Sequence, residues 1–378
     1  MKLVFASNFL NHHQLPLCLE LNHELGPDFS FVATQQLPNE RAQLGYADMS
    51  HRYQWAINSH VGEEEEREAW SRVKEADVLL MGDAPEWLAE ERARSGSLTF
   101  RYNERIFKKA GLRLVDPRPL ASYFLRHTLQ GSRNVHLLSA GAYAAADFRS
   151  IGAYRGRAYK WGYFPEFLDH DLESLFLQKG RAAPSLLWVG RLIEWKHPEH
   201  AVSIARVLRD AGFDFVLSIV GVGPMGRQLV DEVRTRGLGE HVHFLNALTP
   251  EEVRRRMESA DVLLMTSDRG EGWGAVVNEG MNSACAVVAS HLAGSVPYLI
   301  QHGDNGLIYR SGDWRTAAAL VGQLLYDRAL TRRIGSAAYA TIESLWNPRI
   351  AASRLLYVCN SLLSGRPFAY PTGPCSVA

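Results

Sequence analysis

Residues 262–280 read VLLMTSDRGEGWGAVVNEG, and this stretch decides the fold class. It begins with a short apolar run, Val262–Met265, which is typical of a strand buried on both faces of a parallel sheet. A polar loop follows, and a helical pattern then runs from Ala275 to Ala284. Strand, loop and helix in this order predict part of a parallel α/β sheet, and such sheets bind ligands at the carboxyl ends of their strands.

The same alternation continues along the chain. The other apolar runs that predict strands are Leu3–Ala6, Phe29–Val32, Val78–Met81, Leu112–Val115, Val135–Ser139, Leu186–Val189, Phe215–Val220, Val242–Leu245 and Ala286–Ala289. Further helical patterns occupy Pro198–Ala211, Met225–Arg236 and Pro250–Ser259. Two sets of about five strands predict two doubly wound sheets better than one very wide sheet.

The length of 378 residues also favours two domains, at roughly 100–200 residues each. Charges and two prolines in the segment 165–184 indicate the boundary, after which an apolar strand begins again. We therefore expect a first domain over residues 1–175 and a second over 176–345. We expect a helix at 346–364 to cross back to the first domain, and a loose tail of small residues at 365–378.

The composition excludes several classes of protein. Hydrophobic residues make up 46% and charged residues 22%, which is ordinary for a globular protein. Lysine plus arginine equals aspartate plus glutamate at 41 each, so the basic excess of a nucleic-acid binder is missing. Four scattered cysteines indicate reduced thiols in the cytoplasm. No apolar run of about 18 residues predicts a membrane span, and a peripheral contact at the inner membrane face stays open.

Two glutamates in the deciding stretch are the first candidates for chemistry. Glu271 lies in the loop and Glu279 in the helix, and eight helical residues rise about 12 Å. This spacing is too long for the carboxylate pair of a retaining glycosidase, about 5 Å, but it suits the two ends of an extended ligand. Gly272 and Gly274 would let that ligand approach the backbone. The alternative is a loop glutamate and a surface-helix glutamate without a ligand.

Two cations follow another strand end, in the stretch GRLIEWKHP. Arg191 and Lys196 come directly after the apolar run that ends at Val189. Guanidinium and ammonium groups at the carboxyl end of a parallel strand are well placed for a pyrophosphate. The alternative is a pair of solvated loop cations.

The stretch GVGPMG, residues 221–226, contains the glycine spacing of a dinucleotide fingerprint. Pro224 removes one backbone N–H from that loop, and Glu240 precedes the next strand where a ribose-binding acid should follow it. Gly221 and Gly223 therefore favour close backbone approach to another nucleotide, and an NAD-dependent oxidoreductase stays an alternative.

Polar candidates in the first half follow the first strand. Asn11, His12 and His13 would line a crevice at its end, but no further residues at metal-ligand spacing accompany them, so no metal site is predicted. The stretch TFRYNER adds Arg101 and Arg105, with an ordinary loop and helix start as the alternative.

In order, the second-half motifs are GRLIEWK, GVGP, ADVLLMTS, EGWGAVVNEGM and AVVAS followed by GSVPYLIQHGDNG. Over about residues 184–345 this order resembles the retaining GT-B glycosyltransferases of family 4, whose hallmark is two glutamates with seven residues between them. The first half is similar to a narrower group of bacterial glycosyltransferases of surface and capsular polysaccharide synthesis. That similarity rests on SNFLNHHQLPLC, TFRYNERIFKK, LLSAGAYAAADF and YKWGYFPEF.

The resemblance implies roles for individual residues. Arg191 and Lys196 would bind the donor diphosphate, Glu279 the ribose hydroxyls and Glu271 the donor sugar. The backbone around the second glycine turn would add hydrogen-bond donors to the sugar and phosphate, and the first glycine loop would lie against the nucleotide. These donor-side residues are Gly221, Gly223, Gly272, Trp273, Gly274 and Ala275. A first-domain histidine would take part in catalysis, with His13, His12 and His127 as candidates, and Asn11, Arg101 and Arg105 would lie on the acceptor side.

The resemblance thus implies a GT-B fold, with two Rossmann-like domains facing each other across a cleft. It implies a hexosyltransferase that moves a sugar, with retention, from a nucleotide-diphosphate sugar to a hydroxyl group. The acceptor would be a glycan, a lipid-linked or a small molecule, and no metal or other cofactor is expected. The alternatives are the NAD-dependent oxidoreductase and a nucleotide-sugar binding protein without transferase activity.

Overall fold

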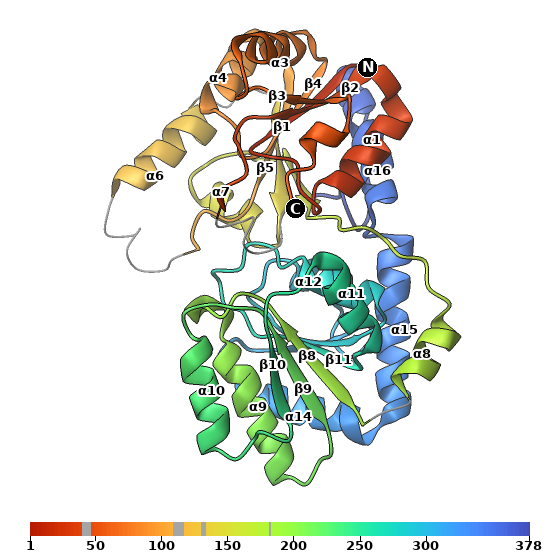
Figure 1. Cartoon of the computed structure of the whole chain (residues 1–378). Helices are drawn as coiled ribbons and strands as arrows, with labels where there is room; N and C mark the ends of the chain where they lie inside the picture. Colours follow the sequence, from red (N-terminus) through yellow and green to blue (C-terminus); the bar gives the residue numbers. More distant parts are fainter. Residues whose placement is uncertain (40–46, 109–116, 130–133, 181–182) are drawn as a thin grey trace. The chain divides into compact units, whose positions relative to one another are not determined.

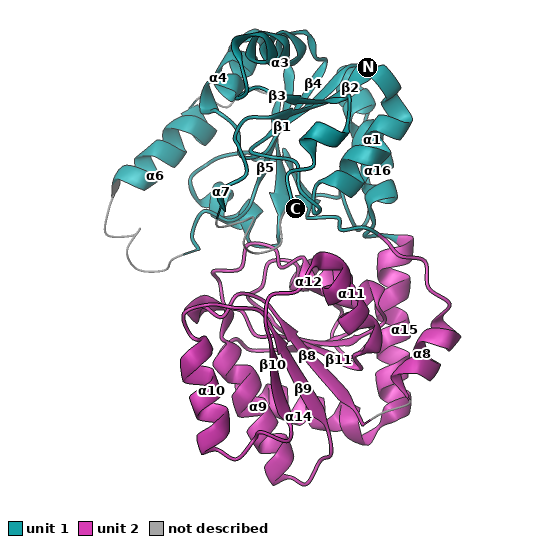
Figure 2. Cartoon of the chain, in the orientation of Figure 1, with its two compact units in different colours: residues 1–166, 345–378 teal, residues 167–344 magenta. Residues whose placement is uncertain are grey.

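The computed structural model describes residues 1–39, 47–108, 117–129, 134–180 and 183–378 (Figure 1). The chain divides into two compact units: unit 1 comprises residues 1–166 and 345–378, and unit 2 comprises residues 167–344 (Figure 2). The first boundary lies earlier than the expected 175/176, because helix α8 (Leu172–Lys179) packs against helix α11 (Pro250–Ser259) of unit 2. The buried Lys179 ammonium also donates a hydrogen bond to the carbonyl of Met257.

Unit 1 is built on a parallel sheet of seven strands in the order β3-β2-β1-β4-β5-β6-β7. The strands are β1 (Leu3–Ser7), β2 (Phe29–Ala33), β3 (Ala56–Asn58), β4 (Val78–Met81), β5 (Leu98–Asn103), β6 (Val135–Ala140) and β7 (Ala158–Trp161). The α-helices are α1 (Leu15–Leu25), α3 (Glu63–Glu75), α4 (Glu86–Ser95), α6 (Pro117–Phe124), α7 (Ala144–Ser150) and α16 (Pro348–Leu363). Short 3₁₀ turns lie at Gly26–Asp28 and Ser50–Arg52, and a π-helical turn follows α6 at Leu125–Leu129.

The sheet of unit 1 is covered on both faces. Alternate side chains of the central strands pack with α3 and α4, where Ala69 and Val73 of α3 are buried. Helix α16 packs against α1 and β5 (Figure 1), so the last long helix of the chain belongs to unit 1. Strands buried on both faces explain why this half reads as continuous apolar runs.

Unit 2 is built on a parallel sheet of six strands in the order β10-β9-β8-β11-β12-β13. The strands are β8 (Ser185–Val189), β9 (Val216–Val220), β10 (Val242–Leu245), β11 (Val262–Met265), β12 (Ala286–Ser290) and β13 (Leu307–Tyr309). With α8 and α11, the α-helices are α9 (Pro198–Asp210), α10 (Gly226–Thr235), α12 (Val276–Asn282), α13 (Val296–Leu299), α14 (Trp314–Tyr326) and α15 (Arg328–Ser344). A 3₁₀ turn at Glu194–Lys196 precedes α9.

The core of unit 2 joins one face of the sheet to α9, α10 and α14, with Ile204, Leu229 and Val321 fully buried. Helix α12 packs on the other face together with α11 and α15. Gly280 makes this contact close, since a Cβ there would lie 2.3 Å from Leu263 of β11. Unit 2 is therefore a three-layer α/β domain, as the strand and helix pattern predicts.

Side-chain caps fix where several helices begin. Thr249 and Glu252 form a reciprocal capping box at the start of α11. The carboxylates of Asp171 and Asp313 accept backbone N–H groups at the starts of α8 and α14. Asn347 caps α16, and Pro348 occupies its first turn.

Several expectations about the elements are corrected. The prediction for Leu112–Val115 falls outside the described residues. Strands β3, β5, β7 and β13 were not predicted, and residues 98–103 form a strand where a loop and helix start were the alternative. None of the helices in the described parts of the chain is both long and apolar enough to span a bilayer.

The tail is not loose. The backbone N–H of Lys160 donates to Ser376, and the N–H of Ala378 donates to Ala158, so the last residues pair with strand β7. Cys375 and Ser376 are buried. The edge of β7 has unpaired backbone groups that the tail satisfies, and this need outweighs the glycine and proline content of the segment.

Candidate functional site

The two central loops of unit 2 leave its sheet at a switch in strand order. From β8 the chain proceeds through β9 to β10 on one side, and from β11 through β12 to β13 on the other. Strands β8 and β11 are neighbours, with Leu186 beside Val262. In open α/β sheets this switch point is where a ligand crevice opens beyond the carboxyl ends of the strands. Arg191 and Lys196 follow β8 and Glu271 follows β11, whereas the predicted glycines Gly221 and Gly223 follow β9.

Lys196 and Glu271 meet at this switch point. The Lys196 Nζ and Glu271 Oε2 atoms lie 2.6 Å apart, and the side chains are 15% and 11% exposed. The hydroxyl of Ser267 donates a second hydrogen bond to the same carboxylate oxygen at 3.1 Å. The sequence predicted both charged residues but not their contact, which joins positions 75 residues apart.

The two loops are also joined through Thr266. The indole N–H of Trp188 in β8 donates to the Thr266 hydroxyl at 2.7 Å, and that hydroxyl donates to the carbonyl of Lys196 at 2.7 Å. The backbone N–H of Asp268 donates to the carbonyl of Trp195 at 2.9 Å. These contacts fix the Lys196 backbone against the loop that carries Glu271.

Both predicted cations lie against one aromatic ring. The Lys196 ammonium is 4.9 Å and the Arg191 guanidinium carbon 5.9 Å from the centre of the Trp195 ring. Cation–π attraction stabilises such pairs by about 0.5–1 kcal/mol at exposed sites. Trp195 therefore gathers two positive charges on one loop, and the sequence signal for it was only its place between them.

The glycine turn before α12 has a structural explanation. Trp273 is fully buried, and its indole N–H donates to Asn278 at 2.8 Å, so its side chain is a core anchor. The predicted donor contact of this stretch is through the backbone and stays a prediction. Gly274 has φ +91°, and a Cβ there would lie 2.6 Å from Met265. Gly272 is buried beside it and Ala275 is half-buried.

Gly221 and Gly223 pack against protein backbone. A Cβ on Gly221 would lie 2.0 Å from the carbonyl oxygen of Gly190, and one on Gly223 would lie 2.4 Å from that of Leu192. The loop after β9 also pairs with the loop after β8, since the Leu192 N–H donates to Val222 at 2.9 Å. Close approach of two loops explains the glycine spacing without a dinucleotide.

Glu279 lies on α12 and is half-buried. Burial raises the pKa of its carboxyl group, and the nearby Arg254 opposes that rise. Arg254 of α11 also donates to the Glu279 carbonyl at 3.1 Å. A carboxylate with little water around it gains from hydroxyl donors, so Glu279 suits a ligand with neighbouring hydroxyl groups.

Unit 1 has its own switch point between β1 and β4. Asn8 follows β1 and donates a hydrogen bond to Asp83, which follows β4, at 3.3 Å. The side-chain amide of Asn11 donates a hydrogen bond to the amide oxygen of Gln14 at 3.3 Å, and the centres of the His12 and His13 rings lie 4.0 Å apart. The structure thus brings the first-strand candidates to a switch point and adds Asp83, for which position after an apolar run was the only sequence signal.

Three first-half candidates do not join that group. Arg101 is buried and donates to Glu86 at 2.8 Å, and Arg105 pairs with Asp147 at 3.2 Å. His127 is buried against Phe148 and contacts the hydroxyl of Tyr154. Burial, assisted by Arg101, lowers the pKa of His127 to about 3. Each of these residues has a partner within unit 1 that the sequence does not reveal, and their acceptor-side or catalytic role stays a prediction.

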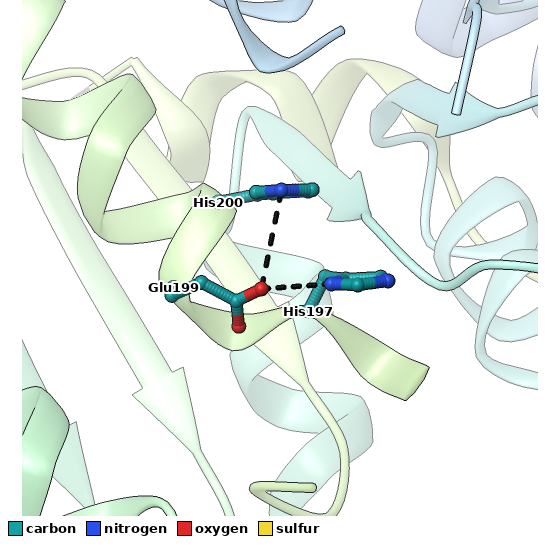
Figure 3. A group of neighbouring side chains, drawn as sticks. All are labelled: His197, Glu199 and His200. Carbon is teal, nitrogen blue, oxygen red and sulfur yellow. Dashed lines mark hydrogen bonds and ion pairs between the residues drawn. The ribbon is translucent and has the colours of Figure 1, made fainter. Parts of the chain in front are cut away.

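A further cluster follows Lys196 directly. His197, Glu199 and His200 present ring nitrogens and a carboxylate oxygen within 4.8 Å of one another (Figure 3). None of these three residues was among the site residues predicted from the sequence. The spacing His-x-Glu-His after a strand end was the sequence signal that could have indicated the cluster.

A search of solved structures defines the class of fold. The structure of Anabaena Alr3699/HepE in complex with UDP matches with a TM-score of 0.70 and 16% identity, covering 96% of this chain and 100% of that one. Together with the two parallel α/β sheets, this match shows the GT-B fold.

The sequence comparisons are more specific for unit 2. Residues 176–341 match the family model described as Glycosyl transferases group 1. Amylovoran biosynthesis glycosyltransferase AmsK of Erwinia amylovora is 29% identical over 182 residues, which cover 47% of this chain and 44% of AmsK. A GDP-mannose-dependent α-(1-6)-phosphatidylinositol monomannoside mannosyltransferase of Mycolicibacterium smegmatis is 30% identical over 190 residues, 48% of each protein. The chain spans less than half the length of these relatives.

Proposed function

We propose that this protein is a retaining glycosyltransferase of the hexosyltransferase type. It would move a sugar from a nucleotide-diphosphate sugar to a hydroxyl group of an acceptor. The observation that carries the proposal is the paired Lys196 and Glu271 at the switch point of unit 2, 2.6 Å apart, with Arg191 on the same tryptophan ring as Lys196. The match of this unit to the group 1 model supports the same chemistry.

In this proposal the donor diphosphate binds at Arg191 and Lys196. The bond between the anomeric carbon and the diphosphate oxygen breaks while the acceptor oxygen bonds to that carbon, and the proton of the acceptor hydroxyl passes to the departing diphosphate oxygen. Negative charge grows on the departing diphosphate, and two fixed cations stabilise that charge without reorganisation. We propose that these cations make a metal ion unnecessary.

The two glutamates would then bind the ends of the donor. Glu271 already accepts hydrogen bonds from Lys196 and Ser267, and a sugar hydroxyl would extend that group. Glu279 would accept the ribose hydroxyls, because its desolvated carboxylate gains most from donors of that kind. Gly272, Gly274 and Ala275 would contribute backbone groups.

The acceptor would bind to unit 1 at the β1/β4 switch point. Asn11, His12 and His13 lie there, and we propose His13 as the histidine that contacts the reacting hydroxyl. Amide and imidazole groups form neutral hydrogen bonds suited to a glycan, lipid-linked or small-molecule acceptor. Synthesis of a surface polysaccharide or glycoconjugate is the role we propose. AmsK, which is named for amylovoran biosynthesis, supports that choice.

The proposal is tested by calorimetric titration with UDP, GDP, ADP and NAD, followed by transfer assays with the matching nucleotide sugar. We expect one nucleoside diphosphate to bind, the Lys196→Ala variant to lose binding, and EDTA to leave transfer unchanged. Binding of NAD alone would favour the oxidoreductase. Binding of the sugar nucleotide without transfer to any acceptor or to water would favour a binding protein.

A further inference from the structure

His197 lies between the two loops of the donor site. Its Nδ1 atom is 2.7 Å from Glu199 Oε1, and its Nε2 atom is 3.4 Å from Asp268 Oδ2 (Figure 3 shows the Glu199 contact). His197 follows Lys196 in the sequence, and Asp268 precedes Glu271 by three residues. One imidazole ring therefore bridges the loop that ends in Lys196 and the loop that carries Glu271.

The backbone at His197 has an uncommon conformation. Its φ of 49° and ψ of 53° lie in the left-handed region, which residues other than glycine adopt uncommonly, although asparagine, aspartate and histidine do so more often than most. Such a conformation persists where the surrounding contacts determine it, and it is frequent at functional sites. Here the left-handed turn starts α9 and directs the ring between two carboxylates.

The charges favour a protonated ring. The hydrogen bond to Glu199 is the main cause that raises the pKa of His197, and the Asp268 carboxylate adds to it against the effect of burial. On α9, burial would raise the pKa of Glu199, yet the bond from His197 holds it below its usual value. Burial and the charge of His197 lower the pKa of His200. The groups that face His197 are thus two carboxylates and a neutral ring.

The arrangement fits hydrogen bonds better than a metal ion. The His197 and His200 rings are stacked with centres 4.7 Å apart and planes inclined by 10°, so their in-plane lone pairs run side by side instead of converging. Two ligand atoms on a tetrahedral zinc ion lie about 3.3 Å apart, and the 2.7 Å between His197 and Glu199 is a hydrogen-bond distance.

We propose that protonated His197 is a positioning residue that holds Lys196 and Glu271 together for the donor diphosphate. The inference rests on the proposed function, because it concerns the same site. The pKa of His197 is raised, so the bridge is complete below pH 6.5 and is lost as the pH rises through that higher pKa. Donor binding should weaken over the same pH range.

The test variants are His197→Gly and Asp268→Asn. Glycine adopts the left-handed backbone without strain, so His197→Gly removes the ring and preserves the turn. We expect its Kd for whichever of UDP, GDP or ADP binds the wild-type protein to rise about tenfold at pH 7, with an unchanged or higher Tm. The increase of Kd as the pH rises above 6.5, which we expect of the wild type, should be absent. His243→Gln, which removes an exposed histidine of the same unit, should retain it.

A second readout does not depend on donor binding. Histidine Cε1–H resonances in NMR should include one with a pKa above 6.5, missing in His197→Gly and shifted to lower pH in Asp268→Asn. If no diphosphate binds the wild type but this resonance behaves as expected, the proposed function fails and the bridge stands. An equal Kd and an equal pH slope in His197→Gly would overturn the inference. So would loss of binding in EDTA with recovery on adding Zn²⁺ or Mn²⁺, which would make the cluster a metal site.

Discussion

The two units place different chemistry at the same point of one architecture. In unit 2 the loops after β8 and β11 bring together Lys196 and Glu271, with Arg191 on the shared tryptophan. In unit 1 the loops after β1 and β4 present mainly neutral polar groups, such as Asn8, which donates to the single carboxylate of Asp83.

The charged residues of unit 2 and the neutral polar residues of unit 1 suit different kinds of ligand. Diphosphates carry concentrated charge and are bound by guanidinium and ammonium groups in a partly desolvated site. Hydroxyl groups carry no charge and are bound by amides, imidazoles and single carboxylates. Strand topology fixes where a crevice opens in each unit, and the loop residues determine which ligand fits it.

Of the variants proposed here, Lys196→Ala in unit 2 should reduce the rate of transfer most. Lys196→Ala removes one cation of the proposed leaving-group site and leaves Glu271, which is 11% exposed, without its ion-pair partner. We expect transfer to fall at least about 100-fold, as for removal of one preorganised charge-stabilising group. Initial rates with a radiolabelled nucleotide sugar would measure it. Lys74→Ala, on the exposed face of α3, is the control that should change nothing. Equal activity of the two variants would exclude the proposed donor site.

A second change tests the packing that supports the charged loops. In Gly223→Ala the new Cβ would lie 2.4 Å from the backbone oxygen of Leu192, which has no flexible end to move. We expect a loss of about 1–3 kcal/mol in the free energy of unfolding, together with weaker diphosphate binding. Denaturant unfolding measures the first and calorimetry the second. Gly239→Ala meets no atom within 4 Å and should unfold like the wild type. Normal stability of Gly223→Ala would mean that this glycine serves a ligand instead.

Much of the fold could be predicted because buried parallel strands read as apolar runs. The missed elements explain the limit. Strand β5 contains Arg101, so it does not read as an apolar run. The Arg101 charge is neutralised by Glu86 on the preceding helix, and no local sequence pattern predicts that pair. Strands β3 and β13 have only three residues each. The tail looked loose because its partner, strand β7, lies more than 200 residues away.

The candidate site likewise has residues that could be predicted from the sequence and contacts that could not. Arg191, Lys196 and Glu271 could be predicted from charge at strand ends, which is a local property. The contacts that hold them, such as Thr266 on the carbonyl of Lys196, join segments 70 residues apart. His127 shows what the sequence does not reveal, because only the fold surrounds this histidine with Tyr154 and Phe148 and buries it.

The neutral polar groups of unit 1 are tested by His13→Ala, for which we expect a more moderate change in the acceptor KM. His13→Ala should raise the acceptor KM about tenfold, the size of one lost hydrogen bond, and leave the Kd for the nucleoside diphosphate unchanged. Steady-state kinetics with varied acceptor would separate the two constants. His51→Gln, whose side chain is 66% exposed in the same unit, is the matched control. A weaker diphosphate affinity in His13→Ala would contradict the assignment of the acceptor to unit 1.

The smallest effect concerns stability in acid and belongs to unit 1. Burial lowers the pKa of His127 to about 3 and that of His136 to about 4. Both residues are about 4% exposed and are neutral in the folded protein. The unfolded chain takes up these protons below about pH 6.5, so stability is lost as the pH falls from there toward the lowered values. Each histidine lowers the free energy of unfolding by at most about 1.4 kcal/mol for each pH unit of acidification, and by less between pH 6.5 and 5.5.

His127→Gln should therefore flatten the decrease of Tm with acid, and His136→Gln should do so independently. Exposed His51, changed to glutamine, should leave the decrease unchanged. If His127→Gln unfolds with the wild-type pH dependence, the ring of His127 titrates in the folded protein as it does in the unfolded chain, which would support its prediction as a catalytic residue. The expected result keeps it in the core and favours His12 and His13 as the histidines of the proposed acceptor side. Scanning calorimetry from pH 7 to pH 5 distinguishes these outcomes without any substrate.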